Sequence, residues 1–84
     1  MVYGGFMARL RVRELAEARG LNMSQLQRAS QLTMNMVRRY WYNTADGKER
    51  GPALAEVRLD ALDRLASVLD VAPSDLIGST PPQQ

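Results

Sequence analysis

The stretch that decides the fold is residues 22–42, NMSQLQRASQLTMNMVRRYWY, in which two residues typical of helix starts stand eleven positions apart. Asn22 is followed three residues later by Gln25, a capping-box spacing that predicts a helix over about residues 23–30. Thr33 is the second N-cap residue and predicts another helix that runs to the end of the stretch. A helix of about two turns between two caps is typical of two short helices joined by a tight turn.

Helices are also predicted on both sides of this unit. Upstream, Val12, Leu15 and Ala16 share one face by their i, i+3, i+4 spacing, and Gly20 supplies the left-handed residue that commonly ends a helix. Downstream, an apolar stripe of the same kind predicts a fourth helix: Leu59, Leu62, Leu65, Ala66 and Leu69. Pro73 begins a short fifth helix. The sequence thus predicts an all-α fold, a compact domain of five short helices.

The remaining segments are assigned from their composition. Residues 1–8 lack periodicity and predict a flexible leader, residues 9–78 form the domain, and residues 79–84 (STPPQQ) predict a disordered tail. The segments 9–12 and 56–59 both alternate apolar and charged residues. In one interpretation they pair as a short two-stranded β ribbon that joins the starts of the first and fourth helices, and in the other they are frayed helix ends.

The composition leaves few chemistries open. The 84 residues include no cysteine and no histidine, which removes disulfides, thiolate metal sites and the usual general base. The serines therefore have no histidine to activate them, and the glycines match neither a phosphate-binding loop nor a dinucleotide fingerprint. We expect no enzyme activity, no cofactor and no metal. No stretch approaches the roughly 20 apolar residues of a membrane span, so we expect no membrane association and a cytoplasmic location.

The charge is unevenly distributed along the chain. Residues 1–58 carry ten Lys or Arg against five acids, whereas residues 59–84 carry Arg64 against four aspartates. The net charges of the two parts are therefore +5 and −3. A basic front and an acidic back indicate one face that meets a polyanion, the alternative being a solvated surface with scattered charges.

The stretch from Asn22 to Tyr42 resembles the phage-repressor, Cro-like or Xre-type helix-turn-helix (HTH) family of DNA-binding domains. The resemblance extends over residues 9–78, where RVRELAEARGL is similar to the family's opening helix and RLDALDRLASVLDVAPSDL to its fourth and fifth helices. It implies a phage-repressor-like fold with four buried positions in the central unit: Leu26, Leu32, Val37 and Tyr40. It also implies a sequence-specific binder of double-stranded DNA, a transcriptional repressor or autoregulator, acting as a homodimer on two half-sites.

Two residues depart from the family's pattern. Gln27 stands where the family prefers a small residue, because the two helices approach closely there. Gln31 stands where it prefers glycine, because the turn needs a positive φ. Gln31 then either adopts the left-handed backbone at some strain, or the turn is remodelled.

The third helix carries the predicted DNA-reading residues. Asn35, Arg38, Arg39 and Tyr42 follow i, i+3, i+4, i+7 spacing and therefore share one face, with Thr33 and Met34 at its start. Asparagine binds adenine and arginine binds guanine through paired hydrogen bonds, and Met34 suits a thymine methyl group. By its matched position Asn35 is the base reader. Arg38 reaches a base or a phosphate, whereas Arg39 and the Tyr42 hydroxyl suit phosphates.

Three further basic residues extend the predicted interface. Arg28 lies on the second helix, which in the family crosses the DNA backbone. Lys48 and Arg50 lie in the long loop 43–56, where they either contact a neighbouring phosphate or are only solvated. Trp41 is expected to cover the base of this loop.

The main alternative function is an antitoxin-like or adaptor module that uses the same fold to bind a protein partner. Its contact surface would be the methionines, tryptophan and tyrosines of the third helix. Single-stranded RNA is a more distant alternative, because these aromatic residues do not line an exposed sheet.

Overall fold

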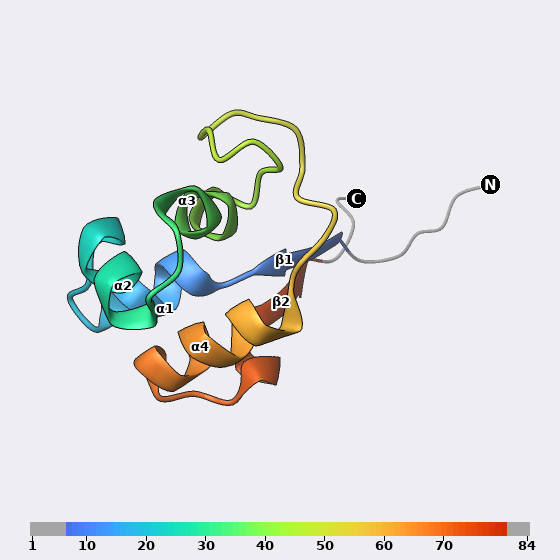
Figure 1. Ribbon diagram of the computed structural model, residues 1–84. Coiled ribbons are helices and arrows are strands. Elements are labelled where there is room, and N and C mark those ends of the chain that lie inside the picture. Colours follow the sequence, from blue (N-terminus) through green and yellow to red (C-terminus); the bar gives the residue numbers. More distant parts are fainter. Residues whose placement is uncertain (1–6, 81–84) are drawn as a thin grey trace.

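The computed structural model describes residues 7–80, and within them the chain forms four α-helices, one 3₁₀ helix and a two-stranded ribbon (Figure 1). In chain order they are β1 (Met7–Leu10), α1 (Val12–Ala18), α2 (Met23–Ser30), α3 (Met34–Tyr42), α4 (Leu59–Leu69), the 3₁₀ helix η1 (Pro73–Leu76) and β2 (Ile77–Thr80). Figure 1 shows α3 and α4 on opposite sides of the domain, with α1 and the ribbon between them.

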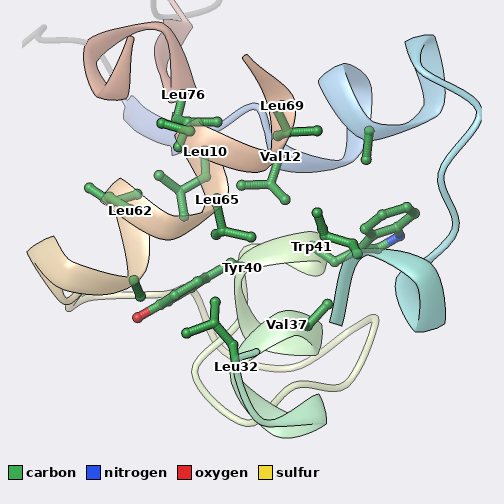
Figure 2. Packing of buried hydrophobic residues seen from close by; sticks show 14 residues of the cluster. Leu10, Val12, Leu32, Val37, Tyr40, Trp41, Leu62, Leu65, Leu69 and Leu76 are labelled. Atoms are coloured by element: carbon green, nitrogen blue, oxygen red, sulfur yellow. The ribbon is translucent and has the colours of Figure 1, made fainter. Parts of the chain in front are cut away.

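The core lies where the four helices meet, and its side chains converge from every helix (Figure 2). The buried residues are Leu10, Val12, Ala16, Leu26, Leu32, Val37, Tyr40, Trp41, Ala61, Leu62, Leu65, Ala66, Leu69 and Leu76. They include the four central positions that the resemblance implies. Trp41 is a core residue rather than the cover of the loop base, and its indole points toward the α1 and α2 side of the core (Figure 2).

The predicted helix starts of the central unit are confirmed. Asn22 Oδ1 accepts a hydrogen bond from the backbone N–H of Gln25 at 2.8 Å, and Gln25 Oε1 accepts one from the N–H of Asn22 at 2.9 Å. Thr33 Oγ1 accepts from the backbone N–H of Met36 at 3.2 Å. Each cap satisfies backbone donors that the first turn of a helix leaves without partners.

The turn between α2 and α3 explains both departures from the family pattern. Gln31 adopts the left-handed conformation, with φ at 60°, so the turn is not remodelled. Gln27 Nε2 donates a hydrogen bond to the backbone carbonyl of Leu32 at 2.7 Å, on the far side of the turn. The long side chain at position 27 therefore satisfies a carbonyl that a small residue would leave to solvent.

Replacing Gln31 by glycine is expected to raise the free energy of unfolding by about 0.5–1 kcal/mol. Glycine takes a left-handed backbone without the steric cost of a Cβ, and this gain exceeds the extra entropy of the unfolded chain. Urea denaturation measures the change. The control is Ala29→Gly in α2, where the backbone is helical and the same new residue should destabilise by about 1 kcal/mol. A loss of stability in Gln31→Gly would show that the turn carries no strain.

The predicted pairing of residues 9–12 with 56–59 is wrong. β1 pairs instead with β2 in antiparallel register, Leu10 opposite Ile77, and the backbone N–H of Arg11 extends the pairing to the carbonyl of Leu76 at 2.6 Å. Residues 56–58 are not free to pair in this way because they lead into α4, where the backbone N–H of Arg58 donates to the Tyr40 hydroxyl at 3.2 Å.

The predicted fifth helix and the outer boundaries also need correction. Pro73 begins a 3₁₀ helix of four residues rather than a fifth α-helix, because Ile77 already belongs to β2. Residues 7–8 lie in β1 and residues 79–80 in β2, not in a leader or a tail. The rest of the predicted leader and tail lies outside the described residues.

Asn43 connects the end of α3 to the ribbon through two hydrogen bonds. It is the C-cap residue of α3, with a left-handed φ of 59°. Its Oδ1 accepts from the backbone N–H of Leu10 at 2.6 Å, and its Nδ2 donates to the carbonyl of Leu10 at 3.0 Å. In an antiparallel pair, alternate residues make the hydrogen bonds to the neighbouring strand. The backbone N–H and carbonyl of Leu10 therefore point away from β2. The amide of Asn43 thus takes the place of a third strand at the edge of β1.

Candidate nucleic-acid interface

Helix α3 divides into a buried and an exposed side. Val37 and Tyr40 are 0% and 1% exposed and face the core, whereas Asn35 and Arg38 are exposed on the other side. Thr33, the N-cap residue, is exposed as well, and Met34 is half-buried. The start of α3 therefore presents polar side chains to solvent, with the helix held from behind by the core.

The last turns of α3 are less open than the spacing predicts. Arg39 and Tyr42 share a face with Asn35 by periodicity, but both are half-buried, and Tyr42 packs against the core. The Nε of Arg39 is buried and has no hydrogen-bond partner among the described residues. Only the tip of this guanidinium is therefore available to a ligand.

The chain folds back on α3 directly after the helix. Residues 44–53 form a closed loop, in which Thr44 and Ala53 make an isolated antiparallel bridge and the N–H of Ala45 donates to the carbonyl of Pro52 at 2.8 Å. Figure 1 shows this yellow-green segment turning back over α3 before it crosses to α4. We call residues 44–53 the return loop.

The return loop contacts the predicted reading residues of α3. Gly47 is buried, with a positive φ of 79°, and a Cβ built on it would lie 3.1 Å from Asn35 Oδ1 and 3.3 Å from Arg38 Cβ. The sequence predicts a turn at Asp46-Gly47 but gives no sign that the turn packs on α3. The loop leaves Asn35 and Arg38 exposed overall, and it carries Lys48 and Arg50 on its exposed part.

The cations of α2, α3 and the return loop differ from most of the other cations in their pairing. Five arginines outside α2, α3 and the return loop form ion pairs with acids: Arg9, Arg11, Arg13, Arg19 and Arg58. The other six cations make no ion pair with an acid of residues 7–80: Arg28, Arg38, Arg39, Lys48, Arg50 and Arg64. All but Arg64 are the cations predicted to contact DNA. Their charge is not neutralised within the described chain and is available to a phosphate.

The surface that the adaptor alternative requires is largely absent from α3. Tyr40 is 1% exposed and Trp41 is 7% exposed, so neither aromatic ring is available to a partner. Met36 and Tyr42 are half-buried and pack against the core.

Residues 7–80 contain no cluster of three or more acids placed to hold a metal ion. None of their helices is long and apolar enough to cross a membrane.

Comparison with known protein families gives one clear finding. The family model described as the Cro/C1-type HTH DNA-binding domain matches residues 11–82, which is most of the chain. Curated proteins and solved structures gave no match.

Proposed function

The chain belongs to the Cro/C1-type HTH DNA-binding family, and from this premise we propose that it is a sequence-specific transcriptional regulator that reads the DNA major groove with α3. The observation that carries the proposal is the exposed pair Asn35 and Arg38, together with cations on α2, α3 and the return loop that make no ion pair with an acid of the described residues. Such a face combines hydrogen-bonding groups for base edges with charge for phosphates.

The start of α3 supports base reading. The major groove is about 12 Å wide and admits an α-helix, whose first residues then lie deepest. Asn35 offers both a donor and an acceptor to an adenine, and Arg38 offers two donors to a guanine or a phosphate. Thr33 and Met34 stand beside them, the first for a hydrogen bond and the second for a thymine methyl.

The flanking cations support phosphate binding. Arg28 on α2 and Lys48 and Arg50 on the return loop are exposed, and Arg39 on α3 is half-buried. The Tyr42 hydroxyl is a further donor for a phosphate. These contacts would set the register of α3 on the duplex without reading its sequence.

We also propose that two copies of the chain bind one operator. A single module of this size buries only about 600–1,000 Å² on DNA, which limits its affinity. Two copies on half-sites roughly one helical turn apart would combine their contacts. A pair bound in this way excludes other proteins from the same base pairs, which suits a repressor or autoregulator.

Selection of bound fragments from random duplex DNA tests the proposal. The retained fragments should share a two-fold-related motif, and log affinity should fall against log salt with a slope of about −4 per copy if four cations bind phosphates. Arg28→Ala and Arg50→Ala should each reduce the slope by about 1. Arg13→Ala is the matched control, because it removes the same charge from an arginine paired with Glu17 on α1. No retention at low salt would contradict the proposal.

A further inference from the structure

The return loop has a defined conformation, held by hydrogen bonds at its ends and within it. Its ends are held by the Thr44–Ala53 bridge and by the N–H of Leu54, which donates to the carbonyl of Asn43 at 3.0 Å. Within it, Asp46 Oδ1 accepts from the N–H of Lys48 at 2.9 Å. A Cβ at Gly51 would overlap the Asp46 carboxylate, so a larger residue there would displace that carboxylate from its place in the loop.

The return loop is seated on α3 at the two residues proposed to read bases. A Cβ at position 47 would lie 3.1 Å from Asn35 Oδ1 and 3.3 Å from Arg38 Cβ, so these neighbours would have to move by a few tenths of an ångström to admit it. Gly47 has a positive φ of 79°, a backbone conformation that glycine adopts without steric cost. An exposed asparagine and arginine on a bare helix would sample several rotamers, and a backbone packed beside them removes some of these.

We propose that the return loop is a positioning element, in which Gly47 holds the side chains of Asn35 and Arg38 in the orientation that discriminates between bases. The inference rests on the proposed function, since it assumes that these side chains read DNA. It goes beyond the proposed function because it gives a role to a residue that does not itself contact bases: Gly47 has no side chain with which to bind DNA. Preorganised contacts lose less side-chain freedom on binding and therefore discriminate more sharply.

Gly47→Ala tests the proposal, with Gly20→Ala as a matched control. Both glycines have positive φ, 79° and 72°, so both variants carry the same kind of backbone strain, but a Cβ at Gly20 would have nothing within 4 Å. The ratio of affinities for the selected operator and for random duplex should fall about tenfold in Gly47→Ala, the loss of roughly one base contact. Binding to random duplex at matched salt should stay unchanged. Gly20→Ala should keep the ratio of the parent.

A second variant and a measurement on the free protein test the same inference independently of Gly47→Ala binding. Gly51→Ala disturbs Asp46 rather than α3, and should reduce the same ratio if the loop acts as a unit. In the free protein, the side-chain amide resonances of Asn35 should shift in Gly47→Ala and not in Gly20→Ala. A parent-like affinity ratio in both Gly47→Ala and Gly51→Ala would overturn the inference and leave the proposed function standing. A parent that shows no preference for any duplex would overturn the proposed function instead, and the inference with it.

Discussion

The double variant Arg38→Ala, Arg39→Ala is expected to bind the selected operator about 100-fold to 1,000-fold more weakly than the parent. Arg38 is exposed beside Asn35, and Arg39 is half-buried, so that only its guanidinium tip faces a ligand. Loss of one bidentate base contact costs about 1–3 kcal/mol, and loss of a phosphate contact adds to it. Fluorescence anisotropy with a labelled operator at fixed salt measures the change.

The control for this double variant must remove the same charge from elsewhere. Arg13→Ala, Arg19→Ala does so, since these arginines pair with Glu17 and Asp70 rather than standing free. Its affinity should stay within a few-fold of the parent, because exposed ion pairs contribute little. Circular dichroism establishes that both double variants keep their helices. If the two variants bind operator equally well, α3 is not the reading helix.

Single variants separate the two arginines. Arg38→Lys keeps the charge but loses the planar pair of donors that fits a guanine edge. If Arg38 reads a base, this variant should lose discrimination between operator and random duplex while its salt dependence stays unchanged. If Arg38 binds a phosphate, both quantities should resemble those of the parent.

The sequence predicted best those features that depend on neighbours a few residues away. The caps at Asn22 and Thr33 each act on an amide three residues on, and both are present in the structure. Such contacts are set by local backbone geometry, which the order of residue types determines almost alone. At Gln31 the sequence left two outcomes open, a left-handed backbone or a remodelled turn, and the structure has the first, with φ at 60°.

Features that depend on distant partners were not predictable in this way. Residues 56–59 share the alternation of residues 9–12 and residues 77–80 (IGST) do not, yet β1 pairs with β2 because η1 brings Leu76 beside Arg11. Periodicity likewise placed Arg39 with Asn35. Arg39 is nevertheless half-buried in the fold, and Gly47 lies against α3. Neither feature follows from the spacing of residues along α3, because both depend on how the chain packs beyond the helix.

Asn43→Ala is expected to lower the free energy of unfolding by about 2–4 kcal/mol, a large effect for a single polar residue. The change leaves the N–H and carbonyl of Leu10 without the partners that Asn43 now supplies at 2.6 and 3.0 Å. Leu10 is 5% exposed, so water replaces these bonds poorly. Stranding a polar group costs about 1–3 kcal/mol; each of these two bonds is only part-buried and so lies near the lower end, and alanine adds about 1 kcal/mol for the left-handed backbone. Urea denaturation measures the sum.

Asn43→Gly separates the loss of the two hydrogen bonds from the cost of placing alanine in a left-handed backbone. Glycine keeps the left-handed backbone of the α3 C-cap but loses both hydrogen bonds, so it should be more stable than Asn43→Ala by about 1 kcal/mol. Asn22→Ala provides the scale, because it removes an exposed cap worth about 1 kcal/mol. If Asn43→Ala cost no more than Asn22→Ala, the amide would not be joining α3 to β1. The C-terminal end of the proposed reading helix would then be fixed by core packing alone, through Tyr40 and Trp41.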